Sequence, residues 1–589
     1  MCSSVQVKRR IAVDPLSPDT TSSVSQWLGE CETNSDSKHL VCSMSEQPFI
    51  PSRLVEVDVL ESQVRLRLVR KDDVLHHDPS RYVALSYCWG GPQEKQLTTA
   101  NLAAYQIEMP WYELPKTLQD AAVATHSLGF RYVWIDSMCI LQDDAHDKSI
   151  EISQMTQVYT HASLTIMAER GSTAAAGFLH GRSFPSGTSL LRFQAEDGTC
   201  GVVTLIQDSA TRSEDNKSLS TRGWTMQEYL LSCRSLAFGT WHTKWSCRSD
   251  RTLHVDGFEP LSESDLLDPF GFGNHLTNDR WEVIDNVRLG DALMFISVNP
   301  GREHDIPSIW QIYNLWDGLV QEYSRRSLSD NKDRVLAISG LAERFSTFLS
   351  ARGGYVAGNW EEQFPQALLW WVAHTHWRHS GSREERPTDY QGPSWSWVSI
   401  NEAVFPESLM VADLCKFHSI HYKLADPQAP FGAVRSAEML IEGPALDVQW
   451  RCIRNHDWLE HYRGDPDYSN FECRWSGDCK ENTNHYCQHV TIAFDALETE
   501  TDWTEAVFLA CRARNSQRSD EIPYPRGLVL MTASHDTQGE LQLSKATKYR
   551  RVGVYSIVLE DQHPLPGCED SSWFLPAPET WPVKQFVVI

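Results

Sequence analysis

Hydrophobic and polar residues alternate along two short stretches near the start of the chain, at residues 54–60 and 64–69. Alternation with a period of two is typical of strands that bury one face, and the short link between the stretches predicts a hairpin. Residues 1–45 are rich in Ser, Thr, Asp and Pro and show no hydrophobic period, so we expect a flexible tail before the hairpin.

From residue 82 onwards, short apolar runs alternate with segments of helical period. Helix followed at once by strand, and repeated, indicates an α/β fold with a mostly parallel sheet covered on both faces. We therefore predict a first domain over residues 46–260. Its expected strands lie at residues 82–89, 131–136, 164–168, 201–206 and 235–238, and its expected helices at 114–128, 147–159 and after residue 222.

The second half of the chain shows two further patterns. Helical period dominates residues 261–400, where apolar stripes at 309–323, 333–342 and 364–372 are most simply core helices. Short apolar or alternating runs separated by turn residues follow, and they predict a β-rich domain over residues 401–589, either a sandwich or a closed sheet. No catalytic pattern stands out in this domain, so we expect it to pack against or regulate the first one.

Composition and charge narrow the class of protein. A chain of 589 residues that is 41% hydrophobic is globular and too long for one core, and its net charge of −25 disfavours binding to nucleic acid. No apolar run approaches the roughly 18 residues that cross a bilayer, and the first residues lack the apolar core of a secretory signal. We expect a cytoplasmic protein whose 15 cysteines, without CxxC pairs, are reduced core thiols.

Several familiar catalytic patterns do not occur in the sequence. The chain has neither a P-loop nor a complete dinucleotide-binding fingerprint, and neither GxSxG nor HExxH. One cluster contains zinc-type ligands at irregular spacing, so we predict that it binds no metal, and we expect no bound cofactor elsewhere. The members of that cluster are Cys473, Cys479, His485, Cys487 and His489.

Three polar clusters follow predicted strands, and they are centred on Ser86, on Asp136 and on the loop before Trp224. Because ligands of open α/β sheets bind at the carboxyl ends of the strands, we expect the three clusters to meet in one site. Two glycines, Gly90 and Gly91, would allow a ligand or another stretch of backbone to approach closely there.

Glu228 is the carboxylate of greatest interest in the third cluster. Thr225 and Glu228 have the spacing of a capping box, in which both side chains bind backbone N–H groups at the start of a helix. The alternative interpretation is a functional carboxylate that is held at a helix start and faces a cleft beside Trp224. The spacing alone leaves both interpretations open.

These segments resemble the signatures of the fungal heterokaryon incompatibility (HET) domain family. The three signatures stand in the family's order as YVALSYCWG at residues 82–90, WIDSMCILQ at 134–142 and RGWTMQE at 222–228, although the family often has alanine where Gly223 stands. The resemblance implies a fungal, cytosolic protein of non-self recognition and programmed cell death. Further matches are LPKTLQDAA at 114–122, VYTHA at 158–162, AGFLHGR at 176–182, PSWSWV at 393–398 and YRRVG at 549–553.

HET domains are similar to Toll/interleukin-receptor (TIR) domains, some of which hydrolyse NAD, so the resemblance implies a TIR-like, flavodoxin-like sheet. In this register Glu228 matches the catalytic glutamate, and the protein becomes a candidate NAD glycohydrolase with NAD as its substrate. One carboxylate suffices in principle, because the leaving nicotinamide is already cationic and needs no acid. The resemblance implies substrate binding by Ser86, Tyr87, Trp89, Asp136, Arg222 and Trp224.

Other interpretations of the same residues stay open. Arg222 could pair with Asp136 for structural reasons, and Tyr87 and Trp89 could be core aromatics. The chain could then be a non-enzymatic module that signals by self-association, or an enzyme for another small molecule built on the same scaffold. Homo-oligomers and an unidentified protein or small-molecule trigger are the partners that these functions imply.

Overall fold

The chain forms two compact units, Met1–Ile306 and Pro307–Ile589. The structure is a computed structural model. It describes residues 13–33, 39, 42, 49–61, 63–74, 81–182, 189–194, 198, 200–205, 219–240, 243–248, 254–255, 309–349, 353–372, 386–406, 414–452, 471–475, 490–495, 504–512, 526–533, 547–557 and 580–589.

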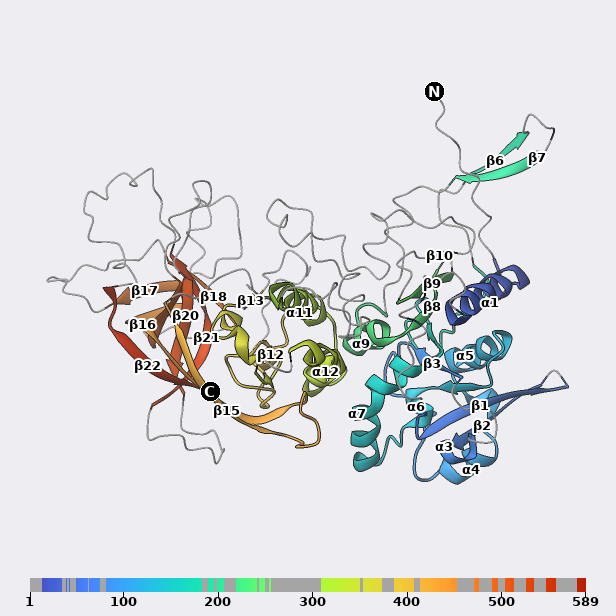
Figure 1. Cartoon of the computed structure of the whole chain (residues 1–589), viewed down its shortest axis with the longest axis horizontal. Coiled ribbons are helices and arrows are strands. Elements are labelled where there is room, and N and C mark those ends of the chain that lie inside the picture. The colour runs from blue at the N-terminus through green and yellow to red at the C-terminus, as the bar shows by residue number, and fades with distance from the viewer. Residues whose placement is uncertain are drawn as a thin grey trace. The chain divides into compact units, whose positions relative to one another are not determined.

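The first unit is built on an eight-stranded sheet with the order β10-β9-β8-β5-β3-β4-β1-β2 (Figure 1). The four central strands run parallel, while the strands at both edges pair antiparallel. The expectation of a mostly parallel sheet is therefore wrong for the edges, and the sheet is mixed. The strands are β1 (Arg53–Leu60), β2 (Gln63–Arg70), β3 (Tyr82–Ser86), β4 (Tyr132–Trp134), β5 (Leu164–Met167), β8 (Arg234–Phe238), β9 (Thr243–Cys247) and β10 (His254–Val255).

The edges are antiparallel because the chain enters and leaves the sheet through hairpins. The predicted hairpin is confirmed, since β1 and β2 pair from Arg53 opposite Arg70 to Leu60 opposite Gln63. When the four parallel strands β3, β4, β5 and β8 are numbered 1 to 4 in chain order, their order across the sheet is 2-1-3-4. All residues of these four strands are buried, as expected for parallel strands covered on both faces.

Helices cover both faces of the sheet. Helices α7 (Ala145–His161) and α9 (Gly223–Leu231) pack together on one face, and α5 (Lys116–Ser127) lies on the other (Figure 1). These helices lie where the sequence predicts them. Shorter elements complete the unit: α3 (Lys71–Val74), α4 (Leu102–Ile107), η1 (Trp111–Glu113), α6 (Asp136–Cys139) and the separate hairpin of β6 (Ser189–Gln194) and β7 (Cys200–Leu205).

One helix of the first unit was not expected from the sequence. Helix α1 (Pro18–Thr33) occupies part of the predicted flexible tail and buries Val24, Leu28 and Cys31. Its Trp27 ring lies 6.2 Å from the ring of Trp245 on β9. The spacing of the three buried residues is helical, but the many Ser and Thr residues between them hide this weak signal. The tail prediction is wrong for these residues.

The second unit begins with two helices around a buried tryptophan. Helices α11 (Ile309–Ser324) and α12 (Leu336–Leu349) lie at two of the predicted apolar stripes. The Trp316 ring packs edge-on against Phe345, Tyr355 and Trp360, with centroids 5.4 to 5.8 Å away. Short elements surround this cluster: η2 (Asn331–Arg334), β11 (Tyr355–Val356), β12 (Asn359–Trp360), η3 (Glu361–Gln363), η5 (Trp397–Ser399) and β14 (Val404–Phe405).

The third apolar stripe, at residues 364–372, is not an α-helix. It forms the short turn η4 (Gln366–Leu368) and the strand β13 (Trp371–Val372), which pairs with β14. Most apolar residues of this run are buried although the run is not helical. A continuous apolar run is typical of a segment that is covered on all sides, and it differs from the one-sided stripe of a surface helix. The helix-rich character predicted for residues 261–400 thus rests on α11 and α12 among the described residues.

The β-rich region closes on itself through the short last strand. Strand β22 pairs antiparallel with β16 and parallel with β21, so β16, β19, β20, β21 and β22 form a closed ring of strands. Inside, the rings of Phe508 and Tyr555 stack 4.5 Å apart. The strands of this region are β15 (Lys416–Leu424), β16 (Val434–Cys452), β17 (Phe471–Trp475), β18 (Val490–Phe494), β19 (Thr504–Arg512), β20 (Arg526–Thr532), β21 (Lys548–Ile557) and β22 (Val583–Val588).

A buried ion pair joins distant segments of the second unit. Arg551 on β21 and Asp495 are both fully buried, with Nη2 2.9 Å from Oδ1. The guanidinium also donates to the carbonyls of Leu368 and Trp370 and lies 3.4 Å from the centroid of the Trp370 ring. The backbone N–H of Arg551 donates to Ser394 Oγ. Two sequence matches far apart in the chain, YRRVG and PSWSWV, therefore meet at this ion pair.

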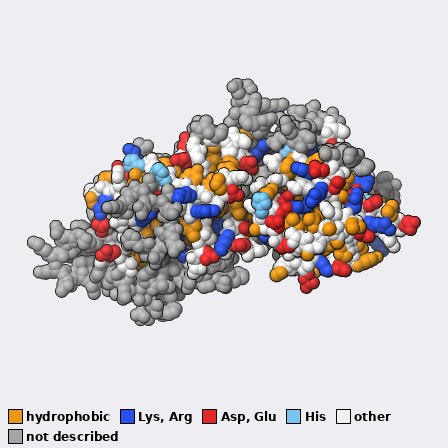
Figure 2. Space-filling view, turned by 90° about the horizontal axis from the view of Figure 1, so that it is seen from below, with side chains coloured by type: hydrophobic (Ala, Val, Ile, Leu, Met, Phe, Trp, Pro, Cys, Tyr) orange, Lys and Arg blue, Asp and Glu red, His pale blue; other side chains and the backbone are white. Residues whose placement is uncertain are grey.

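The surface of the described residues carries both signs of charge. On the face drawn in Figure 2, acidic and basic side chains are interspersed. Within the described part of the chain, no helix combines the length and apolar character needed to cross a membrane.

We expect Arg551→Met to lower the free energy of unfolding by about 3 kcal/mol, because Asp495 would stay buried with Arg386 as its remaining charged partner among the described residues. Arg550→Met is the matched control, since successive side chains on β21 point to opposite faces, and it should cost less than about 1 kcal/mol. Urea unfolding of the full chain measures both. Adding Asp495→Leu to Arg551→Met should restore part of the loss; equal stability of the two single variants would contradict the prediction.

Candidate functional site

The candidate site begins at the end of the central strand β3. Ser86 is the last residue of this strand and is fully buried. Strands β4 and β5 lie on either side of β3. The order in which the chain adds strands to the sheet therefore reverses at β3. In open α/β sheets, ligands bind outside the carboxyl ends of the strands at such a reversal. Ser86 lies at this point.

Tyr87, Trp89 and Asp136 form one polar network beyond the strand ends. Asp136 opens α6 directly after β4, and its Oδ2 accepts a 2.9 Å hydrogen bond from Trp89 Nε1. Its Oδ1 accepts from the backbone N–H of Ser137, and the Tyr87 hydroxyl donates to Ser137 Oγ at 2.8 Å. Tyr87 is buried, whereas Trp89 and Asp136 are partly exposed. The first two sequence signatures thus meet through hydrogen bonds.

Glu228 does not cap a helix. Helix α9 starts at Gly223, and Arg222 occupies the N-cap position without a side-chain capping bond. Thr225 lies inside the first turn, where its hydroxyl donates to the carbonyls of Leu219 and Arg222. Glu228 follows in the second turn, where the backbone N–H groups are already bonded within the helix. The capping-box interpretation is therefore wrong.

The carboxylate of Glu228 is buried beside the end of β3. The residue is only 7% exposed, and its Oε2 has no hydrogen-bond partner. The hydroxyl of Ser86 likewise has no hydrogen-bond partner of good geometry, although it lies close enough to Glu228 to lower the pKa of the carboxyl. Most buried polar atoms in proteins have a hydrogen-bond partner, so an unpartnered carboxylate oxygen calls for an explanation.

Burial raises the pKa of Glu228 to about 7. The Ser86 hydroxyl opposes this shift, the negative charge of Asp136 adds to it, and the positive charge of Arg222 and the Tyr159 hydroxyl oppose it. Burial also raises the pKa of Asp136, against the effect of Arg222. Glu228 is thus close to half ionised at neutral pH, which is the range in which a general acid or base works best.

Arg222 connects the third signature to the first. Its Nη1 donates a 2.7 Å hydrogen bond to the backbone carbonyl of Tyr87, so the loop before α9 is held against the end of β3. Trp224 lies one helical turn before Glu228 and is partly exposed. The structure therefore brings Ser86, Tyr87, Asp136, Arg222 and Glu228 together, with Trp89 attached through Asp136.

One contributor to the site was not singled out from the sequence. Tyr159 on α7 is fully buried, and its hydroxyl donates to the carbonyl of Leu85, 3.1 Å away. The same hydroxyl lies near Glu228 and lowers its pKa. Tyr159 belongs to the match VYTHA, but in the sequence it is indistinguishable from the core aromatics on the apolar face of α7.

The structure explains why a glycine stands at position 90. Its φ is +73°, and a Cβ added to it would lie 2.7 Å from Cα of Thr173. The backbone N–H of Ala174 donates to the carbonyl of Trp89, so the loop after β5 crosses over the residues that follow β3. The sequence predicted that a ligand or another stretch of backbone approaches this glycine. In the structure, the backbone at Thr173 makes this close approach to Gly90. Gly91, by contrast, has open space around its Cα.

The matches LPKTLQDAA and AGFLHGR also have a structural explanation. Asp120 on α5 is buried, and its Oδ2 accepts hydrogen bonds from the backbone N–H groups of Phe178 at 2.7 Å and Leu179 at 3.0 Å. Lys116 pairs with the other carboxylate oxygen. These contacts hold the loop after β5 against α5. They account for these segments without a role in catalysis.

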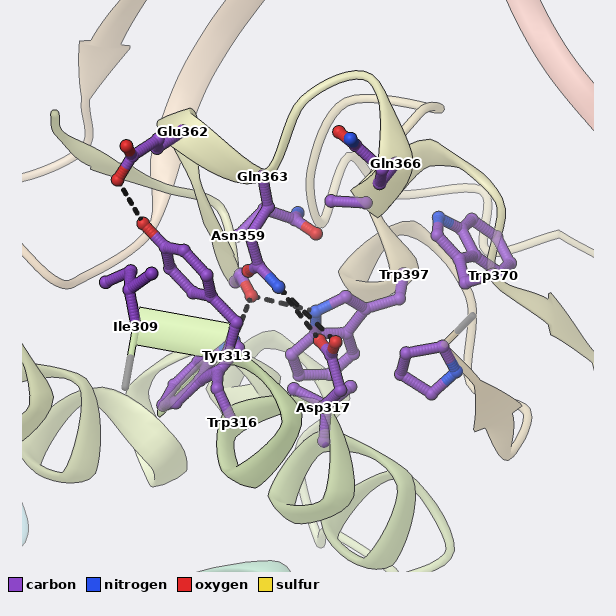
Figure 3. A pocket seen from close by; sticks show the side chains of 14 residues that line it. Ile309, Tyr313, Trp316, Asp317, Asn359, Glu362, Gln363, Gln366, Trp370 and Trp397 are labelled. Carbon is purple, nitrogen blue, oxygen red and sulfur yellow. Dashed lines mark hydrogen bonds between the residues drawn. The ribbon is translucent and has the colours of Figure 1, made fainter. Parts of the chain in front are cut away.

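The second unit contains a separate cavity of about 280 Å³ (Figure 3). The Tyr313 hydroxyl donates to Glu362 at 2.6 Å, and Gln363 donates to Asp317 at 3.3 Å. Aromatic walls with two carboxylates suit a planar or cationic group. Sequence analysis missed this cavity, because aromatic residues at helical spacing are equally typical of core. Its aromatic lining consists of Tyr313, Trp316, Trp370 and Trp397.

The zinc-type cluster considered in the sequence lies almost entirely outside the described residues. Only the backbone of Cys473, on β17, is described. The prediction that it binds no metal therefore stays a prediction.

Glu228→Gln should stabilise the protein more at pH 8 than at pH 5. The folded pKa near 7 lies above the usual 4.5, so the folded state binds a proton more tightly between these values, and the contribution of Glu228 to stability falls as pH rises through this window. The full effect is up to about 3 kcal/mol. Unfolding at several pH values measures it, with the exposed Glu94→Gln as control. A constant difference between wild type and Glu228→Gln would contradict the raised pKa.

Comparison with curated proteins and with solved structures gave no match. Comparison with protein-family models gave one that begins with β3 and ends at Glu228. The matched segment includes the three signatures and every residue of the candidate site. Residues 82–228 match the family model described as heterokaryon incompatibility protein (HET).

Proposed function

We propose that this protein acts in fungal heterokaryon incompatibility and programmed cell death, in the cytoplasm, and that its HET domain hydrolyses NAD. The observation that carries the proposal is the buried carboxylate of Glu228, with an unpartnered oxygen and a pKa near 7, beside the carboxyl end of β3. Perturbed carboxylates of this kind are concentrated at functional sites. Glu228 is the last residue of the segment that matches the HET family model, and this match supports the proposal.

The strand order adds support for a TIR-like domain. The arrangement 2-1-3-4 of the parallel strands is the beginning of the flavodoxin-like order, in which a ligand binds beside the first strand. Here the first strand is β3, and Glu228 lies on the helix that packs against it. This likeness is one of topology, and the similarity to TIR domains is part of the proposal.

The proposed reaction breaks the C–N bond between nicotinamide and ribose. The bonding electrons leave with the ring, whose nitrogen loses its positive charge, so no acid is needed for departure. The positive charge that develops on the ribose would be stabilised by the ionised form of Glu228. Water then adds to the ribose carbon and releases one proton, which gives ADP-ribose and free nicotinamide.

The other site residues have roles that suit this substrate. Arg222 could bind a phosphate of NAD in place of the Tyr87 carbonyl, since guanidinium groups bind phosphate strongly. The rings of Trp89 and Trp224 are partly exposed and could pack against nicotinamide or ribose. Ser86 lies near enough to Glu228 to hold the reacting end of the substrate.

Substrate access would require a local movement. Glu228 is 7% exposed, and the hydrogen bond from Arg222 to the Tyr87 carbonyl holds the loop before α9 in place. We propose that NAD or a trigger opens this contact, in the way that lids admit substrate to other enzymes. A trigger that binds elsewhere, as a protein or a small molecule, would act by favouring the open state.

The purified full chain should release nicotinamide from NAD, and Glu228→Gln should reduce this release by about a hundredfold or more. The ionised carboxylate is the active form, so kcat/KM should rise with pH up to about 7 and then level off. Chromatographic detection of nicotinamide measures the rate. Glu94→Gln, at an exposed site, is the matched control.

The alternative is a HET domain that signals by self-association. In that case Glu228→Gln would fold normally and still kill cells when expressed in a fungal host, and wild type would oligomerise without NAD loss. Those results would overturn the catalytic proposal. Hydrolysis of another small molecule by wild type, abolished by Glu228→Gln, would keep the site and change the substrate.

A further inference from the structure

Four potential metal ligands converge beneath α1 in the first unit. They are Cys31 at the end of α1, His39, Cys42 and Cys247 at the end of β9. One donor atom from each of the four lies within 4.8 Å of every other. Cys31, His39 and Cys42 are at most 8% exposed, and Cys247 is partly buried. Sequence reasoning missed this group, because Cys247 is far along the chain from the other three.

The geometry of the group is close to that of a tetrahedral zinc site. With Zn–S bonds of about 2.3 Å and a Zn–N bond of about 2.0 Å, the donor atoms of a tetrahedron lie about 3.5–3.8 Å apart. Cys247 Sγ and His39 Nδ1 are 3.4 Å apart, which fits an edge of this tetrahedron. The other donor atoms need to move by about 1 Å at most. Three cysteines and one histidine are a common ligand set of structural zinc.

A buried arginine lies where such a site needs positive charge. Arg234 Nε donates a 3.0 Å hydrogen bond to Cys31 Sγ, and its Nη2 donates to the Cys42 carbonyl at 3.3 Å. Zinc with three thiolates carries a net charge of −1, which the guanidinium would offset. Hydrogen bonds from neighbouring groups to the ligands are a regular feature of metal sites and orient the ligands.

The cluster is distinct from the site around Glu228. Cys247 pairs with Arg234, the first residue of β8, so it lies at the amino end of the parallel strands. Ser86, by contrast, is the last residue of β3, which runs parallel to β8 through β5. Catalytic zinc sites keep one position open for water, whereas four protein ligands leave none. A structural role therefore follows from the ligand count.

We propose that Cys31, His39, Cys42 and Cys247 bind one structural zinc ion that fastens α1 to β9. The four ligands come from three separate places in the chain, so one ion would join these places. A short amphipathic helix buries little apolar surface, and the ion would add to the packing that holds α1 in place. This inference differs from the sequence-based expectation of no metal, which considered ligand spacing within one segment. Zinc binding rests on the cluster alone and is independent of NAD hydrolysis.

Zinc content of the purified full chain tests the proposal, with metal measured by mass spectrometry after dialysis against metal-free buffer. We expect about one zinc per chain in wild type, and loss of this zinc in Cys31→Ser and Cys247→Ser. Cys233→Ser is the matched control, because Cys233 is a buried thiol next to the Cys42 carbonyl but is not one of the four. Cys200→Ser, at an exposed thiol, controls for surface binding. Both controls should keep the zinc.

His39 allows a second test that preserves the ligand count. His39→Ala should lose most of the zinc, whereas His39→Cys should retain it, because four thiolates also form a closed zinc site. A merely structural histidine would not show rescue by cysteine. Should the ligand variants fail to fold, wild type still decides: replacement of zinc by cobalt should give the absorption bands of tetrahedral cobalt with thiolate ligands.

Two results would overturn the proposal. Wild type purified under reducing conditions could contain no zinc, with the three cysteines of the cluster as unmodified thiols, and then fail to bind added zinc or cobalt. Alternatively, a disulfide within the cluster could be found by mass spectrometry of the unreduced protein, although the structure holds all these cysteines as free thiols. Zinc loss in wild type on chelation should lower the melting temperature, and added zinc should restore it.

Discussion

The burial of one carboxylate, Glu228, is the constraint on which the candidate site depends. Glu228 lies on α9 and faces the end of β3, where its carboxyl group is removed from water and its pKa is raised to about 7. Ser86, Arg222 and Tyr159 offset only part of this cost, because each of them lowers the pKa and the net shift stays upward. A neutral side chain of similar size would be more stable at this position. This cost is the reason why we propose a chemical role for Glu228.

The buried ion pair of the second unit shows the opposite arrangement. Arg551 and Asp495 are fully buried too, but they bind one another, and the arginine also binds two carbonyl groups. Charges that are paired in this way hold together segments that are far apart in the chain. The comparison separates two kinds of buried charge: a partnered pair that holds the ring of strands to the segments beside it, and a buried carboxylate that has an unpartnered oxygen.

Contacts also divide the family signatures into two kinds of residue. Gly90 and Asp120 are explained by the loop after β5, which crowds the glycine and donates two N–H groups to the carboxylate. Ser86, Asp136 and Glu228 meet one another at the end of the parallel strands. A substitution in the first kind would disturb the scaffold, whereas the second kind contains the residues proposed to meet the substrate. The proposed zinc site belongs to neither kind and lies at the amino end of the parallel strands.

The sequence by itself determined the positions of most helices and strands of the first unit, and the convergence of the three polar clusters, because hydrophobic period and strand ends are local properties. Only the tertiary structure decided that Thr225 does not cap α9, that the sheet is mixed, and that the last strand closes a ring. It alone brought Cys247 to Cys31. The reason is physical: local pattern records which side of an element is buried, whereas pairing and ligand geometry depend on segments far apart in the chain.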